Sequence, residues 1–184
     1  TAINERPARP VEACLKTTGR DRMPEGRDRM PDFEMLQFPE TPYVYVEGRS
    51  SMAPADISRE MGRAFRTAWE AMQAAGIPPG GPALSVYHDY DPEEMRFRAG
   101  FVVNVADAPK AEAPLRADML PAGEVLHFTH RGPYATLRDD YEKMMKHLSE
   151  TGQAPGAPSW ELYLNDPSDT PAEDLVTEVY VPLA

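Results

Sequence analysis

The sequence predicts an α+β domain in which two β-α-β-β units follow one another along the chain, with two helices and an eight-stranded sheet of which the pattern locates six strands. A Gly/Pro-rich loop occurs twice at a constant offset of 76 residues. Each copy of the loop follows a stretch of helical periodicity and precedes strand-like alternation. The domain is therefore expected over residues 41–184, with repeat one at 41–105 and repeat two at 123–184.

The two loops run from Gly76 to Tyr87 and from Gly152 to Tyr163. Five of their twelve aligned positions are identical, and all five are Gly, Pro or Tyr. Chance rarely places five such uncommon residues in register, so the loops mark the same point in two copies of one unit. The alignment also sets Ser85 of the first copy against Glu161 of the second.

Apolar residues recur every three or four positions before each loop and predict two amphipathic helices, one over Ile57, Met61, Phe65, Ala68, Trp69 and Met72 and the other over Leu137, Tyr141, Met144, Met145 and Leu148. Pro54 suits the first turn of the first helix, and Gly76 and Gly152 suit the C-terminal caps.

Strands are expected at 42–49, 84–88, 96–104, 124–130, 160–164 and 176–183. Residues 106–121 should link the copies. Residues 1–40, rich in Pro, Arg and Met, should form an extended arm, or a basic segment that docks on an acidic body.

Charge and composition exclude several classes of protein. The chain carries a net charge of −11, and residues 32–184 hold twelve basic against twenty-five acidic side chains, so direct nucleic-acid binding is not expected. No apolar run approaches the roughly 18 residues of a membrane helix, and no signal-peptide pattern begins the chain. The single Cys14 fits a reducing cytoplasm. Nucleotide-loop and zinc motifs are absent from the sequence, so neither a cofactor nor a metal is expected.

Alternation along the strands predicts two faces of the sheet. The apolar face should pack under the helices: Val44, Val46, Leu84, Val86, Leu126, Phe128, Trp160, Leu162, Val179 and Val181. The opposite face carries five of the eight tyrosines and three carboxylates: Tyr43, Tyr45, Glu47, Ser85, Tyr87, His127, Thr129, Glu161, Tyr163, Glu178 and Tyr180. Tyrosine rings and a carboxylate attract a flat cation, although a polar sheet face is also common for solubility alone.

Motifs in the second repeat run from Val125-Leu-His-Phe-Thr-His-Arg-Gly-Pro-Tyr134 through Tyr141 and Trp160-Glu-Leu-Tyr-Leu-Asn-Asp-Pro167 to Thr177-Glu-Val-Tyr-Val-Pro182. Together they resemble the GyrI-like small-molecule-binding domain, which is also the effector-binding module of bacterial multidrug-responsive and AraC-type transcription activators. The resemblance covers residues 41–184. It implies a pseudo-symmetric, curved, eight-stranded antiparallel sheet with two helices packed on one face and a ligand groove on the other.

The resemblance also implies which residues bind the ligand. A glutamate and aromatic residues line the groove in members that bind lipophilic cations. The best match for that glutamate is Glu161, with Tyr163 beside it, and Glu178 is the second choice. The other expected ligand-binding residues are Tyr87, Tyr45, Tyr43, Tyr180 and His127. The break in symmetry between Glu161 and Ser85 points to the functional end of the groove.

Three functions follow from these expectations. The first is a stand-alone binding protein that senses or sequesters a small, flat, lipophilic or cationic molecule. The second is a hydrolase of reactive ring compounds, because some stand-alone GyrI-like proteins open strained cyclopropane rings; Glu161 and Tyr163 (or Tyr180) would then be catalytic. The third is an acidic inhibitor with a protein partner, a DNA-handling enzyme such as gyrase. We expect binding rather than catalysis, with no membrane partner and an undefined oligomeric state.

Overall fold

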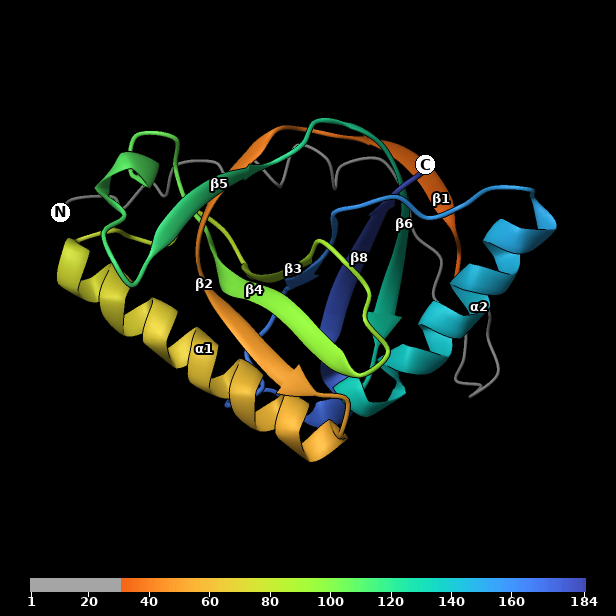
Figure 1. Cartoon of the computed structure of the whole chain (residues 1–184), viewed down its shortest axis with the longest axis horizontal. Helices are drawn as coiled ribbons and strands as arrows, with labels where there is room; N and C mark the ends of the chain where they lie inside the picture. Colours follow the sequence, from red (N-terminus) through yellow and green to blue (C-terminus); the bar gives the residue numbers. More distant parts are fainter. Residues whose placement is uncertain (1–30) are drawn as a thin grey trace, which may run out of the picture.

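One eight-stranded antiparallel sheet runs through the computed structural model, which describes residues 31–184, and curls into a half-barrel (Figure 1). The strands are β1 (Glu34–Phe38), β2 (Thr41–Ser51), β3 (Ala83–Tyr87), β4 (Glu94–Val102), β5 (Arg116–Leu120), β6 (Gly123–Arg131), β7 (Ser159–Tyr163) and β8 (Val176–Pro182). Helix α1 spans Pro54–Ala75 and helix α2 spans Leu137–Glu150. The expected α+β class and the eight-stranded sheet are confirmed, and six of the eight strands lie at the expected positions.

The strand order exposes the internal repeat. The order of the strands across the sheet is β1-β6-β8-β7-β3-β4-β2-β5. The counterparts in the two repeats are β1 and β5, β2 and β6, β3 and β7, and β4 and β8. When every strand is replaced by its counterpart and the order is read from the opposite edge, the same order results. The pseudo-twofold axis therefore passes between β3 and β7. Ser85 and Glu161 are cross-strand partners there, and they are also related by the 76-residue offset. The axis runs through this one residue pair.

Two strands lie where none was expected. Strand β1 falls in the segment assigned to the arm and pairs with β6, and β5 falls in the segment assigned to the linker and pairs with β2. Each repeat is therefore a β-β-α-β-β unit whose first strand pairs with the second strand of the other repeat. The rest of the expected arm, residues 1–30, lies outside the described residues.

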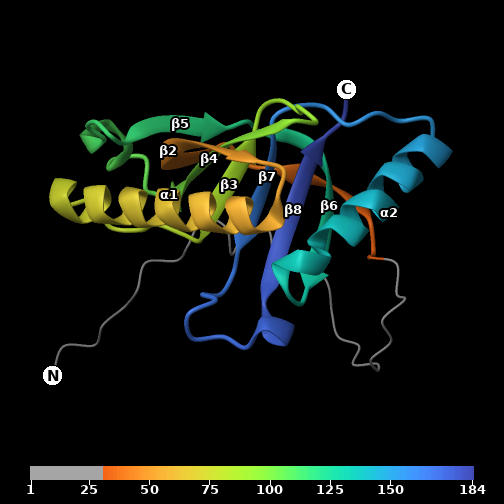
Figure 2. The same ribbon diagram turned by 60° about the horizontal axis from the view of Figure 1, so that its bottom comes forward.

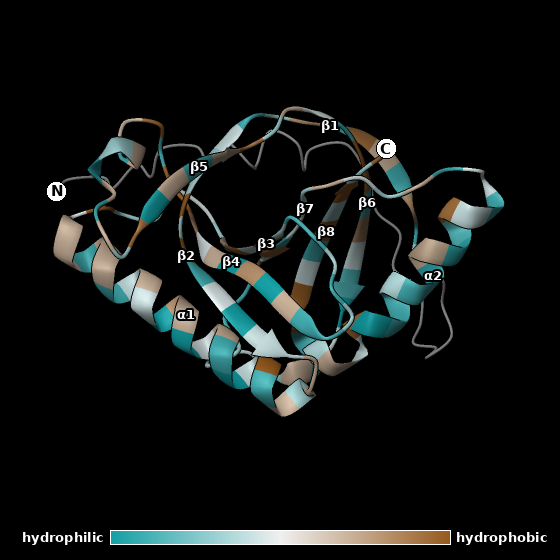
Figure 3. Cartoon of the chain, viewed as in Figure 1, coloured by the Kyte–Doolittle hydropathy of each residue, from teal (hydrophilic) through white to brown (hydrophobic). Residues whose placement is uncertain are grey.

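Both helices bury one narrow stripe against the sheet. Helix α1 starts with Pro54 in its first turn and ends at Gly76, which has a left-handed φ of 64°, as expected. Its buried residues, Ala64, Ala68 and Met72, are spaced by four. Helix α2 buries Leu137, Met144 and Leu148, and Gly152 follows its cap with a φ of 71°. In strand β4, by contrast, polar and apolar residues alternate one by one over the first five positions (Figure 3).

The inside of the half-barrel is a single aromatic core contributed by all eight strands: Phe38, Tyr43, Tyr45, Leu84, Val86, Val102, Leu120, Val125, Trp160, Leu162 and Tyr180. Its rings are in edge or stacked contact, with the Trp160 centroid 4.9 Å from Phe38 and 6.0 Å from Tyr180. Aromatic rings therefore occupy much of the interior of the half-barrel.

Strands β2 and β4 approach each other closely at Gly100. A Cβ atom there would lie 1.8 Å from the Val44 carbonyl oxygen, so no side chain fits at this position.

The expected assignment of faces is wrong for β3 and β7. Leu84 and Leu162 are cross-strand partners inside the half-barrel, and Val86 and Trp160 pack there with them, instead of under the helices. Ser85, Tyr87, Glu161 and Tyr163 consequently lie on the helix side. The physical reason is that the curled sheet buries both faces, so an apolar residue does not identify which face carries the helices.

A charged cluster closes one side of this interior. The buried His127 is in contact with Glu178 through Nε2, and its Nδ1 lies 2.9 Å from Glu34 on β1. The Thr129 hydroxyl donates to both Glu178 oxygens, at 3.1 and 3.0 Å. The Glu178 carboxylate is thus surrounded by its own donors and anchors β8 to β6.

The pH dependence of stability should report on this cluster. Burial by itself lowers the pKa of His127, but the hydrogen bonds and charges of Glu178 and Glu34 outweigh burial and raise it. Such a group stabilises the fold below its unfolded-state pKa of about 6.5, and this contribution is lost as the pH rises through the folded-state value. The Tm of the wild type should therefore fall more steeply from about pH 6 to 8 than that of His127→Gln. Parallel Tm curves in calorimetry would contradict the pairing.

Candidate functional site

Glu161 lies at the centre of β7, and its contact with Tyr141 of α2 places its carboxylate on the helix side of the sheet. Strand β7 lies between α1 and α2 in the view of Figure 2. Glu161 is 5% exposed. The Tyr141 hydroxyl of α2 donates to its Oε1 at 2.7 Å, and the Tyr163 hydroxyl lies 2.6 Å from its Oε2. The Tyr163 hydroxyl is also 3.0 Å from Ser85 Oγ. We call Ser85, Tyr87, Tyr141, Glu161 and Tyr163 the Glu161 cluster.

Hydroxyl groups are the direct partners of this buried acid. Within residues 31–184 no Lys or Arg side chain pairs with Glu161. Burial raises the pKa of the Glu161 carboxyl, and the hydrogen bonds from Tyr163, Tyr141 and Tyr87 and the charge of His130 only partly offset this. Burial, followed by the charge of Glu161, places the pKa of each of the three tyrosines well above its ordinary value. The tyrosines therefore remain protonated hydrogen-bond donors.

A chain of aromatic rings extends outward from the cluster. Phe65 of α1 lies 5.8 Å from Tyr163 and 6.2 Å from Phe101, measured between ring centroids. Trp69 lies 5.6 Å from Phe101, and on the other side Tyr134 lies 5.6 Å from Tyr163. Trp69 and Tyr134 are 42% and 40% exposed. Large exposed rings that lead to a buried carboxylate are typical of a ligand-binding surface.

His130 is an ionisable side chain that interacts electrostatically with Glu161. It lies on the helix side of β6, and its Nδ1 is 2.7 Å from Asp140 on α2 while its Nε2 is 3.1 Å from the Pro133 carbonyl. Both ring nitrogens thus face an oxygen acceptor, which the imidazolium form satisfies. Asp140 is also 3.0 Å from Lys143. The negative charge of Asp140 is therefore already matched.

The structure divides the expected ligand-binding residues into two groups. Glu161, Tyr163 and Tyr87 come together on the helix side. Five others belong to the interior of the half-barrel or its rim: Tyr45, Tyr43, Glu178, Tyr180 and His127.

Side chains of the second group already contact charged residues of the same chain. The Arg98 guanidinium lies 4.4 Å from the Tyr45 ring centroid and donates to the Tyr43 hydroxyl at 2.9 Å. Arg98 also pairs with Asp118 at 2.6 Å. Burial raises the pKa of Tyr43 to about 12, so its hydroxyl stays protonated. The chain's own cation thus covers the tyrosine faces that were expected to attract a ligand.

Sequence reasoning did not assign Tyr141, Phe65 or Tyr134 to ligand binding, although it paired Ser85 with Glu161 as the pointer to the site. Phe65 appeared only as an apolar position of its helix, and Tyr141 as such a position and as part of the family motifs. The 76-residue offset relates them to each other, and this signal could have placed both beside the Ser85–Glu161 pair.

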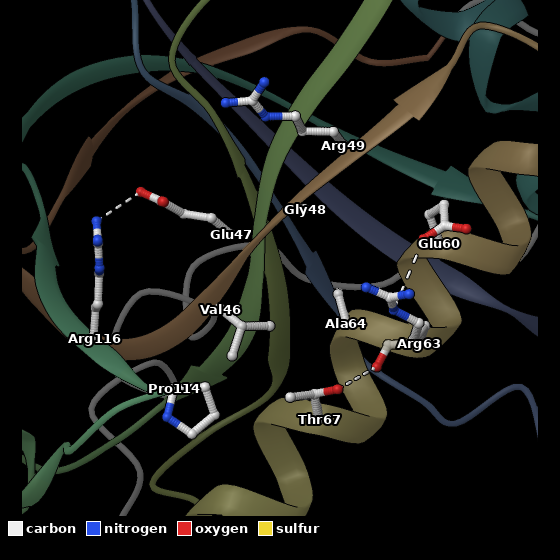
Figure 4. Close-up of a pocket in the computed structure, with 10 residues that line it drawn as sticks. All are labelled: Val46, Glu47, Gly48, Arg49, Glu60, Arg63, Ala64, Thr67, Pro114 and Arg116. Atoms are coloured by element: carbon white, nitrogen blue, oxygen red, sulfur yellow. Dashed lines mark hydrogen bonds and ion pairs between the residues drawn. The ribbon is translucent and has the colours of Figure 1, made fainter.

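One surface hollow lies away from the cluster. It has a volume of about 520 Å³ and opens between β2 and α1. Figure 4 shows Arg116, paired to Glu47, on one side of the hollow and Arg63 and Ala64 of α1 on the other, with Val46 between them. None of the expected ligand-binding residues lines it.

In the part of the chain from residue 31 onward, no group of three His, Cys, Asp or Glu side chains could hold a metal. Among the same residues, no helix is long and apolar enough to cross a membrane.

Comparison with solved structures identifies similar folds at low sequence identity. The EcmrR C-terminal domain has a TM-score of 0.70 and 20% identity, over 85% of this chain and 99% of that one. SAV2435 bound to tetraphenylphosphonium has a TM-score of 0.58 and 15% identity, over 83% and 94% of the two chains. A hydrolase from Listeria innocua has a TM-score of 0.54 and 16% identity, over 83% and 91%. No curated protein matches the sequence.

The family assignment rests on the sequence as well as on the fold. The family described as the GyrI-like small molecule binding domain matches residues 31–184. That range begins just before β1, in agreement with the strand that the sheet adds at its edge. The chain therefore belongs to the GyrI-like small-molecule-binding family.

Proposed function

We propose that the chain binds a flat, lipophilic cation between α1 and α2, with Glu161 as the counter-charge. The observation that carries this proposal is a 5% exposed carboxylate whose direct partners are hydroxyl groups. A buried carboxylate without a cation is costly, and a bound cation would remove that cost. The tetraphenylphosphonium bound by SAV2435, which is similar in fold, is a lipophilic cation with four aromatic rings, arranged tetrahedrally rather than in one plane.

The cluster would act through two kinds of contact. The hydroxyls of Tyr141 and Tyr163 hold the Glu161 carboxylate in one orientation, so little entropy is lost when a cation arrives. The rings of Phe65, Tyr163 and Tyr134 offer edges and faces to a planar ligand. Ring contact would provide most of the affinity, and the carboxylate would select for positive charge.

Glu161→Gln should abolish cation selection while leaving the fold intact. Glutamine keeps the shape but removes the charge; its amide oxygen accepts from one of the two tyrosine hydroxyls, and its NH2 group donates to the other hydroxyl oxygen. Loss of one partner of a buried charge pair costs about 2 kcal/mol or more. We expect the Kd for tetraphenylphosphonium, measured by calorimetry, to rise at least about 30-fold.

Glu47→Gln provides the matched control, because Glu47 is an exposed carboxylate paired with Arg116 at 3.0 Å, away from the cluster. Its Kd should equal that of the wild type. An unchanged Kd in Glu161→Gln would refute the assignment of Glu161.

The affinity for a permanently charged cation should increase with pH. Because burial raises the pKa of Glu161, the neutral acid persists above the ordinary titration range of a carboxyl group, and a proton must leave before the cation binds. The association constant should rise by about tenfold per pH unit below the pKa of Glu161 and level off above it. The same titration of Glu161→Gln should be flat. A pH-independent wild type would show that the carboxylate is not coupled to binding.

Hydrolysis of a reactive ring compound is the second candidate. A carboxyl group with a raised pKa, hydrogen-bonded to tyrosine hydroxyls, can serve as a general acid or base. In addition, the Thr177 hydroxyl, on the cross-strand partner of Tyr163, is buried without a hydrogen-bond partner among residues 31–184. Such a hydroxyl beside the cluster could bind a water or a polar substrate atom. The hydrolase from Listeria innocua is similar in fold.

Product analysis separates the two candidates. A cyclopropane-containing alkylating compound would be incubated with the wild type and with Tyr163→Phe, which removes the hydroxyl nearest to Glu161 and keeps the ring. A binding protein should protect the compound stoichiometrically and release it unchanged. Ring-opened product formed over many turnovers, and lost in Tyr163→Phe, would instead establish catalysis.

A further inference from the structure

The pseudo-twofold axis passes through a pair of residues that differ in charge. Ser85 and Glu161 are cross-strand partners in the β3–β7 ladder, and each is the counterpart of the other in the repeat. A symmetric site would hold two carboxylates on the axis. This chain holds one, because the counterpart of Glu161 is a neutral hydroxyl.

The surrounding side chains share this asymmetry. The Tyr163 hydroxyl bridges the pair, at 2.6 Å from Glu161 and 3.0 Å from Ser85. Tyr141 donates to Glu161, whereas its counterpart in the first repeat, Phe65, has no hydroxyl. The wall contributed by the first repeat is therefore uncharged and largely aromatic.

Other acids near the cluster offer no buried partner for a second positive charge. Asp140 lies 2.7 Å from His130 and 3.0 Å from Lys143, so both of its oxygens are occupied. Asp166 interacts with Tyr134 at the exposed end of the ring chain, where solvent screens its charge.

We propose that Ser85 sets the charge selectivity of the site, which accepts a planar ring system with one positive charge and rejects a ring system of the same shape with two. This inference rests on the proposed function. The second charge would be buried against Ser85 and Phe65 without a counter-ion. The effective penalty for burying an unpaired ion outweighs the gain from ring contact.

A matched pair of probes tests the proposal on the wild type. 1-Methyl-4-phenylpyridinium and 1,1′-dimethyl-4,4′-bipyridinium have nearly the same shape and carry one and two fixed charges. We expect calorimetry to give a Kd at least about tenfold lower for the monocation. Equal affinities, or a preference for the dication, would overturn the inference and leave the proposed function standing. If neither of the two probes nor tetraphenylphosphonium bound, the proposed function itself would fail.

Ser85→Glu tests the residue directly. It places a second carboxylate across the ladder from Glu161, so the preference for the monocation should shrink at least about tenfold or reverse. Gln73→Glu is the matched control, since it adds the same charge at an exposed position on α1 and should keep the wild-type ratio. An unchanged ratio in folded Ser85→Glu would overturn the role of Ser85.

A double variant guards against misfolding caused by two adjacent buried carboxylates. Ser85→Glu combined with Glu161→Gln keeps a single carboxylate and moves it to the other side of the axis. The preference for the monocation should then return with the wild-type sign. If the double variant preferred the dication, the number of buried carboxylates at the site could not be the cause of the charge selectivity.

Discussion

The site depends on the antiparallel pairing of β3 and β7, centred on Ser85 and Glu161. This pairing joins the two repeats into one sheet and places the pseudo-twofold axis at the middle of the molecule. Because the axis lies between the helices, side chains from α1 and α2 converge on it. A buried carboxylate at this point is held by tyrosine hydroxyls rather than by a cation, and the candidate binding chemistry follows from that imbalance.

The two faces of the curled sheet have separate roles. The interior is filled with aromatic rings, and its charged groups are matched within the chain, as in His127 with Glu178 and Arg98 with Asp118. Matched charges and close packing stabilise the fold but leave little to offer a ligand. On the helix side, the packing is split into one apolar cluster under each helix, and the Glu161 carboxylate between them has tyrosine hydroxyls as its direct partners.

The repeat, both helices and six of the eight strands could be predicted from sequence, because the Gly/Pro loops and the helical periodicity are local signals. Strands β1 and β5 could not, since each is short and pairs only with the other repeat. The resemblance identified Glu161 and Tyr163, but the alternation assigned them to the face opposite the helices, whereas they lie on the helix side. Alternation separates two faces without stating which one carries the helices, and Trp160 and Leu162 are buried as fully as residues under a helix. The contact between Tyr141 and Glu161 needs the tertiary structure.

The central claim is that Glu161 is a buried carboxylate whose charge is balanced only when a cation binds. Carbon-13 NMR of the glutamate carboxyl groups, with Glu161 assigned from Glu161→Gln, measures its titration directly. The account predicts that the pKa of Glu161 lies above the ordinary glutamate value in the free protein and falls when tetraphenylphosphonium is added. An ordinary pKa that does not respond to the cation would contradict it.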